Sequence, residues 1–434
     1  MTVLVVILTV TALGLPPALA IDRRQPPIVL GALGFLYGSG LVYAVLLTQA
    51  IAGVRWSLVP ATAALVALSA IAFLWSRRPV AAGVPPVRLS AIDIATAALV
   101  AAYVSYVTID RPRHWDFWAI WGLKGRVFYE AGGIDWRFLE SETNRFAHPD
   151  YPLLVPLNFA YAALAAGEWD DRWTGLLPAA FGIALLLVVR AAAAAEVRPA
   201  AAAATAFAAA GFALSPQIGL AEAPLIAFGT AGLLMVRRAL RLDDDGAMRH
   251  GALLLGLAGV TKNEGVTLCL AAVAGLLVAQ APRRRFLSLW PAAVLIGSWM
   301  LLRAVHTLPT DLTSGAVVAR FLSRLDALPQ AAAAMLASLG RPFLWLVLLV
   351  AVLLFPKRIP AGEKFLLVAA GVQLVFFAGA YLSTPHDAAW HIAASWGRIS
   401  RQLGPPVLFA VMVALAQSFT SHQDGAHAEA RSDG

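Results

Sequence analysis

The chain has 434 residues, of which 60% are hydrophobic and 13% are charged. Soluble domains carry roughly 25% charged residues, so this composition excludes an ordinary soluble fold and predicts a membrane protein. The net charge of +8 does not indicate nucleic-acid binding, because the basic residues stand in short clusters between apolar runs. The single cysteine, Cys269, excludes an intrachain disulfide or a thiolate metal site.

Apolar runs that are long enough to cross a ~30 Å hydrocarbon core recur from the N-terminus to near residue 420. They predict an all-α, polytopic transmembrane bundle of about 13 spans, each bounded by Pro, Gly or charge. The expected spans are 2–20, 28–53, 57–75, 89–108, 174–192, 199–216, 222–238, 249–263, 265–281, 286–305, 331–355, 364–382 and 403–420.

Basic clusters fall in alternate loops of this arrangement, and the positive-inside rule places such loops in the cytoplasm. The clusters are Arg23/Arg24, Arg77/Arg78/Arg88, Arg190/Arg198, Arg237/Arg238/Arg241/Arg249, Arg283–Arg285 and Lys357/Arg358. The N-terminus and the segments 109–173, 217–221, 306–330 and 383–402 are then expected outside the cytoplasmic membrane.

The two ends of the chain differ in character. Ala18-Leu19-Ala20 resembles a signal-peptidase site, but the N-terminus has no basic start and Arg23-Arg24 follow directly. Cleavage would also invert the alternation of the loops, so we expect a retained first helix within an N-terminal membrane region, 1–88. The polar residues 421–434 are expected to form a disordered cytoplasmic tail.

The segment 109–173 combines many tryptophans with charges of both signs. Aromatic residues near a membrane surface often form only an interfacial belt. Indole faces also stack on sugar rings and carboxylates bind hydroxyls, so the mixture favours a carbohydrate site at the membrane surface. The tryptophans are Trp115, Trp118, Trp121, Trp136, Trp169 and Trp173, and the acids include Asp110, Asp116, Glu130, Asp135, Glu140, Glu142 and Asp150.

The stretch 115–124 is predicted to form an interfacial helix with Trp118, Trp121 and Lys124 along one face. Asp116 lies near its start, where the helix N-terminus stabilises an ionised carboxylate. Asp116 is therefore either a general base or only an N-cap.

The order of motifs in this segment resembles the first outer loop of GT-C glycosyltransferases, especially bacterial aminoarabinose transferases and protein O-mannosyltransferases. The matching residues are Asp116, Lys124, Gly132-Gly133, His148-Pro149-Asp150-Tyr151-Pro152-Leu153, Gly167 and Arg172. The resemblance implies a GT-C-like catalytic region over 89–420, an acid that opens the loop, and a lateral helix at 151–166 that stays at the outer surface. The expected substrate-binding residues of the loop are Trp115, Trp118, Lys124, His148, Asp150 and Tyr151.

Two later segments extend the resemblance more weakly. Ala221-Glu222-Ala223-Pro224 opens a span where these families usually carry Asp, so Glu222 is a second catalytic candidate or a side chain that snorkels to the surface. Gly259-Val260-Thr261-Lys262-Asn263-Glu264-Gly265 resembles their Leu-Thr-Lys-Gly turn. Lys262 and Glu264 either bind substrate, with the lysine on a lipid-linked phosphate, or pair only with each other.

The last expected outer segment contains His391, Arg398 and Arg401, which one helical face could present together. These residues suit a phosphate or diphosphate, or alternatively anchor the helix among lipid headgroups. No HExxH, cysteine pair or dense acidic cluster indicates a catalytic metal, and no other cofactor is expected.

The resemblance implies inverting transfer of a sugar from a polyprenyl-phosphate donor to a glycan, lipid or protein acceptor on the outer face. Asp116 would be the base, while Lys262, Arg398 and Arg401 would stabilise the departing lipid phosphate. The partners expected are thus this donor, its acceptor and membrane lipids, without nucleic acid. A polymerase or ligase that uses lipid-diphosphate glycans, and a transporter or flippase, are the alternatives.

Overall fold

The structure is a computed structural model, which describes residues 2–75, 88–112, 114–310, 317–338 and 360–417. Those residues are all-helical, without a strand. Among them, nine helices are long and apolar enough to cross a membrane by length and composition, which supports the prediction of a polytopic membrane protein.

The nine candidate spans are α1 (Thr2–Ile21), α2 (Pro27–Ile51), α3 (Leu58–Trp75), α4 (Ala91–Ile109), α9 (Leu176–Ala194), α11 (Glu222–Leu242), Arg283–Val305, α19 (Ala361–Ser383) and Ala388–Gln417. The span Arg283–Val305 contains α14 (Arg283–Leu287) and α15 (Trp290–Val305), and Ala388–Gln417 begins with α20 (Ala388–Ile399) and η4 (Ser400–Leu403).

Three of the other predicted spans are shorter helices: α10 (Pro199–Ala213), α12 (Asp245–Gly259) and α13 (Asn263–Val278), with 15, 15 and 16 residues. At 1.5 Å per residue, about 20 residues are needed to cross a bilayer core, so length alone does not establish these three as spans. Most of the predicted span 331–355 lies outside the described residues, as do Arg77, Arg78, Arg113, Lys357, Arg358 and the tail 421–434.

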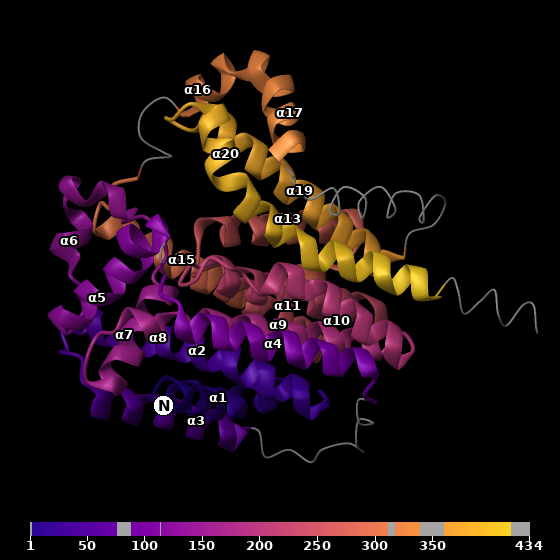
Figure 1. Ribbon diagram of the computed structural model, residues 1–434, viewed down its shortest axis with the longest axis horizontal. Coiled ribbons are helices and arrows are strands. Elements are labelled where there is room, and N and C mark those ends of the chain that lie inside the picture. Colours follow the sequence, from indigo (N-terminus) through magenta and orange to yellow (C-terminus); the bar gives the residue numbers. More distant parts are fainter. Residues whose placement is uncertain (1, 76–87, 113, 311–316, 339–359, 418–434) are drawn as a thin grey trace, which may run out of the picture.

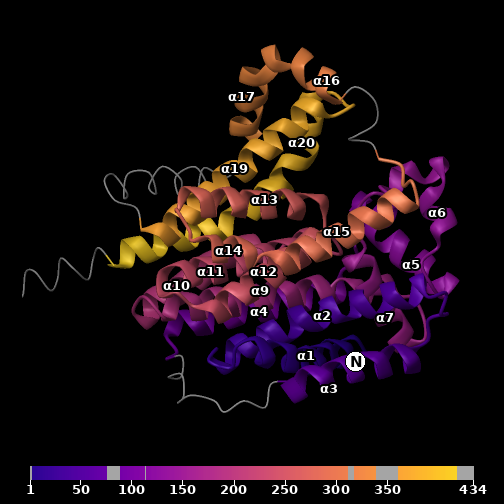
Figure 2. The ribbon, with the colours of Figure 1, turned by 180° about the vertical axis from the view of Figure 1, so that it is seen from behind.

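Shorter helices occupy the connecting segments. They are the π-helical η1 (Phe117–Trp121), α5 (Gly122–Ala131), α6 (Trp136–Glu140), η2 (Glu142–Ala147), α7 (Leu154–Ala166), α8 (Asp171–Thr174), α16 (Val317–Ser323), η3 (Leu325–Ala327) and α17 (Leu328–Ser338). Figures 1 and 2 show α1 to α4 and α9 to α11 running along the long axis, with α5, α6 and α7 gathered at one end and α16 and α17 projecting beside α20.

The two ends of the bundle carry different side chains. Arginines from four of the predicted cytoplasmic clusters, Arg24, Arg88, Arg190 and Arg237 among them, line one cavity, so these clusters gather at one end. We call this end of the bundle the basic end. The opposite end, where Asp116, Lys262 and Arg398 meet, is the site end. This separation agrees with the alternation of basic loops in the sequence.

Small residues let α1 and α2 approach closely. A Cβ on Gly14 would stand 1.9 Å from the carbonyl oxygen of Gly34, and one on Gly38 would stand 1.9 Å from that of Val10. Helices in an apolar bundle associate through such close packing, because lipid offers the same apolar contacts as another helix. The N-terminal helix is therefore an integral part of the packed bundle.

The helix α7 was expected to lie laterally, and at 13 residues it is shorter than a span. The oxygen of Pro156, near its start, and the ring of Trp169, just after its end, both lie within 3.2 Å of where a Cβ on Gly125 would stand. The start of α7 and the segment after it therefore contact α5. However, α7 is buried rather than laid on the surface, and Asn158 donates a 3.1 Å hydrogen bond to the backbone oxygen of Ser39 in α2.

We predict that Gly38→Val lowers the thermal unfolding midpoint of the detergent-purified protein, since overpacking typically costs about 1–3 kcal/mol and here the clash is with backbone. Gly31→Val is the matched control on the same helix, because a Cβ there has no neighbour within 4 Å. Equal unfolding midpoints for the two variants would show that the close α1–α2 contact does not stabilise the protein.

A labelling experiment tests the placement of α7. With Cys269 replaced by Ala, single cysteines at Glu142 and at Glu168, both exposed, should react with a membrane-impermeant maleimide from the same side. A cysteine at Arg249, which is exposed near the start of α12, should react from the other side. Reaction of the two loop cysteines from opposite sides would make α7 a span.

Candidate functional site

Five charged residues from four separate parts of the chain form one cluster at the site end. Arg398 of α20 hydrogen-bonds Asp116 through Nη1, and the same nitrogen lies 3.4 Å from Oε1 of Glu222. Lys262 Nζ lies 3.1 Å from that Glu222 oxygen and 2.8 Å from Oε1 of Glu264. We call Asp116, Glu222, Lys262, Glu264 and Arg398 the charge cluster.

Burial makes this pairing obligatory. Glu222 is 3% exposed and Lys262 is 4% exposed, and an unpaired charge at such positions would carry a large desolvation cost. Burial alone would lower the pKa of Lys262, but the Glu222 and Glu264 carboxylates outweigh it and raise that pKa above its usual range. Lys262 is therefore a fixed positive charge. Pairing with Glu264 does occur, but Glu222 shares the lysine.

Asp116 does not act as an N-cap. It precedes η1, yet its backbone is already helical and its side chain accepts no capping hydrogen bond. Its carboxylate faces Arg398 instead, with Nδ1 of His114 3.5 Å away. Burial lowers the pKa of His114, against the opposing effect of Asp116, and His114 Nδ1 accepts the backbone N–H of Asp116 at 3.1 Å. His114 is therefore neutral near pH 7, and Arg398 is the cation on Asp116.

The expected shared face of Trp118, Trp121 and Lys124 is wrong. Trp118 is 62% exposed, whereas Trp121 and Lys124 are fully buried. The reason is local: residues 117–121 form a π-helix, whose i→i+5 bonding changes the helical period on which the prediction depended. Trp115 is also exposed, so Trp115 and Trp118 present free indole surface at this end of the bundle.

Trp121, His148 and Tyr151 form a stacked aromatic wall behind this surface. The ring centroids of Trp121 and Tyr151 are 5.5 Å apart, and those of His148 and Tyr151 are 4.7 Å apart. Lys124 Nζ lies over both the Trp121 and Tyr151 rings and donates a 3.0 Å hydrogen bond to the His148 backbone oxygen. Three motif residues of the loop, Lys124, His148 and Tyr151, thus pack together.

Lys124 is a different kind of lysine from Lys262. Burial lowers the pKa of Lys124 to about 7, although Asp150 opposes the shift. A buried amine with such a pKa exchanges protons near neutrality, whereas an exposed lysine stays charged. Lys124 can therefore change its charge when a ligand changes its surroundings.

Asp150 connects the aromatic wall to the charge cluster. Its Oδ2 accepts hydrogen bonds from Asn263 Nδ2 and from Thr310 Oγ1, both at 3.1 Å. Asn263 follows Lys262 directly, so this bond fixes the start of α13 and with it the cluster lysine. Sequence reasoning missed Asn263, Thr310 and His114, although Asn263 stood inside the motif that drew attention to Lys262.

His391, Arg398 and Arg401, which were expected on one helical face, do not all lie together in the structure. His391 lies at the site end, where its Nδ1 is 3.0 Å from Thr384 Oγ1 and its ring meets the edge of Tyr381. Arg401 instead hydrogen-bonds Ser215 Oγ and the backbone oxygens of Gly211 and Leu214. The expected common face is wrong, because the chain tightens into the 3₁₀ turn η4 after Ile399 and rotates Arg401 toward the end of α10.

No group of three or more His, Cys, Asp or Glu side chains within the described ranges could hold a metal ion. Comparison with known protein families, with curated proteins and with solved structures finds no match to the chain. The site is therefore interpreted from its own geometry.

We predict that Lys262→Met destabilises the protein by about 3–5 kcal/mol, because it leaves Glu222 buried with only the longer Arg398 contact. Adding Glu222→Gln should recover most of the loss, since both buried charges are then gone. Thermal unfolding in detergent measures the stability of the single and the double variant. The control is Lys364→Met, because Lys364 lies in α19 and is not part of the charge cluster. No recovery in the double variant would show that the pair is not coupled.

Proposed function

We propose that this protein is an integral membrane glycosyltransferase of the GT-C type that moves a sugar from a polyprenyl-phosphate donor to an acceptor. The observation that carries the proposal is the Arg398 nitrogen shared by Asp116 and Glu222, with Lys262 on the same Glu222 oxygen. A base and two phosphate-binding cations, the parts such a reaction needs, thus share one site at the end of an apolar bundle.

The cations have the chemistry of a phosphate site. Arginine and lysine bind phosphate oxygens through charge-assisted hydrogen bonds, and a guanidinium can do so with two parallel bonds. Arg398 Nε is buried without an acceptor among the described residues, which costs about 1–3 kcal/mol. A donor phosphate satisfies this nitrogen and replaces Asp116 on Arg398, so that donor binding releases the base.

Asp116 then accepts the proton of the acceptor hydroxyl or amine. The acceptor oxygen or nitrogen forms a bond to the anomeric carbon from the face opposite the phosphate, and the bond from that carbon to the phosphate oxygen breaks. The electron pair leaves with the lipid phosphate, whose added charge Lys262 and Arg398 stabilise. Single displacement inverts the anomeric centre, and Glu222 positions the two cations.

Sugar recognition is assigned to the residues next to the charge cluster. Trp115 and Trp118 expose indole faces that suit stacking on a sugar ring, while the aromatic wall and Lys124 form the buried side of the site. His391, at the same end, contacts Thr384 and Tyr381 and is assigned to substrate binding. Arg401 is assigned no role in the reaction, because its two Nη groups bond Ser215 Oγ and the backbone oxygens of Gly211 and Leu214 at the end of α10.

The sharpest test is Asp116→Asn, which keeps the size and the hydrogen bond to Arg398 but cannot accept a proton. Because general-base catalysis contributes about 10²- to 10⁴-fold, sugar transfer from a polyprenyl-phosphate donor by purified protein should fall by that order. Donor binding and thermal stability should persist.

Asp135→Asn is the matched control in the same loop. Asp135 caps α6 by accepting the Phe138 N–H, and Asn caps as well as Asp, so this change should be silent. Near-full turnover in Asp116→Asn would remove the catalytic role of Asp116. Turnover by the wild type with a lipid-diphosphate glycan but not with the monophosphate would favour a polymerase or ligase instead.

A further inference from the structure

A second polar site lies at the basic end, away from the charge cluster. It is a cavity of about 500 Å³ between the start of α2, the end of α9, the start of α10 and the end of α11. Six arginines line it, with Glu196 as the acidic residue of the lining: Arg24, Arg88, Arg190, Arg237, Arg238 and Arg241.

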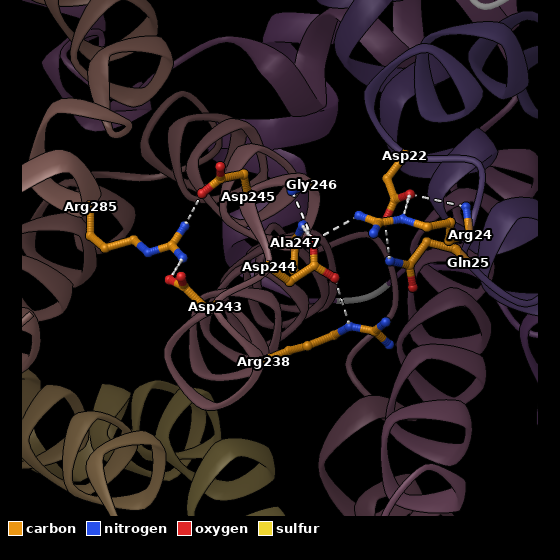
Figure 3. A network of polar contacts seen from close by, with 10 residues as sticks. All are labelled: Asp22, Arg24, Gln25, Arg238, Asp243, Asp244, Asp245, Gly246, Ala247 and Arg285. Atoms are coloured by element: carbon orange, nitrogen blue, oxygen red, sulfur yellow. Dashed lines mark hydrogen bonds and ion pairs between the residues drawn. The ribbon is translucent and has the colours of Figure 1, made fainter. Parts of the chain in front are cut away.

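The carboxylates near these arginines neutralise only part of their positive charge. Asp93 pairs with Arg190, Glu196 is shared by Arg237 and Arg241, and Glu363 pairs with Arg237. Figure 3 shows the remaining contacts, in which Asp22 binds Arg24, and Asp244 accepts from both Arg24 and Arg238. Within the described ranges, six arginines thus face five carboxylates. In addition, Arg190 Nη1 is buried without an acceptor among the described residues.

Two helix N-termini add positive potential. Pro26 and Val29 at the start of α2, and Pro199 at the start of α10, line the cavity, and neither helix has a side-chain cap. Uncapped backbone N–H groups at helix starts favour anions. The C-terminal ends of α9 and α11 oppose this effect, but Arg190, Arg237 and Arg241 in those helices offset them.

Apart from Gln25, the rest of the lining is apolar and includes Val29, Val188, Leu234, Met235 and Phe409. A soluble anion gains nothing from such a wall, whereas an acyl chain does. The cavity also lies where the candidate spans α2, α9 and α11 begin or end, and basic pockets at the ends of membrane spans bind anionic lipids. We propose that this cavity binds an anionic phospholipid, with the phosphodiester on the arginines and an acyl chain along the apolar wall.

Binding is tested on the full-length purified protein with phosphatidylglycerol, against phosphatidylcholine as the neutral-headgroup lipid. Native mass spectrometry should show preferential retention of phosphatidylglycerol, and that lipid should raise the thermal midpoint more. Each arginine near a lipid surface contributes about a five-fold effect, so Arg88→Gln combined with Arg241→Gln should weaken the affinity roughly 25-fold.

Arg249→Gln is the matched control, because Arg249 is exposed near the same end but does not line the cavity. Its affinity for phosphatidylglycerol should stay unchanged. Ala195→Trp, at the cavity wall, should block lipid binding with every arginine intact, which keeps the test valid if an arginine variant fails to fold.

Several results would overturn the proposal. Equal retention of the two lipids by the wild type, or equal loss of affinity in Arg249→Gln and in the double variant, would show only a general surface charge effect. Full displacement of phosphatidylglycerol by millimolar inorganic phosphate would assign the cavity to a soluble anion.

Discussion

Charge buried in an apolar bundle must be paired, and the arrangement of both ends of this protein depends on that constraint. At the site end, Lys262 and Arg398 hold Glu222 between them, although these three residues come from distant parts of the chain. Each contact brings two helices together: α11 to the start of α13, and α11 to α20. Because a buried ion left without its partner is costly, the cluster limits how these helices can move relative to one another.

The same constraint shapes the basic end. Arg237 of α11 bonds Glu196 after α9 and Glu363 of α19, and Arg190 of α9 bonds Asp93 of α4. The basic clusters that indicated the topology in the sequence therefore also hold helices together through ion pairs. Between α1 and α2, close glycine contacts hold the helices together without charged residues. Polar pairs and small residues together supply the specificity that apolar contact alone does not give in lipid.

The two ends use arginine differently. In the charge cluster, Arg398 and Lys262 face three carboxylates, so an incoming phosphate must compete with acids that are already bound. In the proposed reaction, this competition would couple donor binding to the release of Asp116. Around the basic-end cavity, arginines outnumber the nearby carboxylates of the described residues, so the proposed anion would bind without displacing a carboxylate. A site whose cations are already paired with acids suits a substrate that must leave after each turnover. A site with excess positive charge suits an anion that stays bound.

The sequence by itself determined the apolar bundle, the position of eight of the nine candidate spans and the separation of basic clusters from the charged loop, because these depend on composition and run length. The ninth candidate span, Ala388–Gln417, begins inside the segment 383–402 that was expected outside the membrane. It also singled out Asp116, Glu222, Lys262, Glu264 and Arg398, since charges are conspicuous in apolar surroundings. Only the tertiary structure decided which of them meet. The π-helix at Phe117–Trp121 and the 3₁₀ turn at Ser400–Leu403 changed the helical period, which exposed Trp118, buried Trp121 and turned Arg401 away. Partners such as Asn263 for Asp150, and the arginine-lined cavity between four helix ends, arise from segments far apart in the chain, so no local pattern could reveal them.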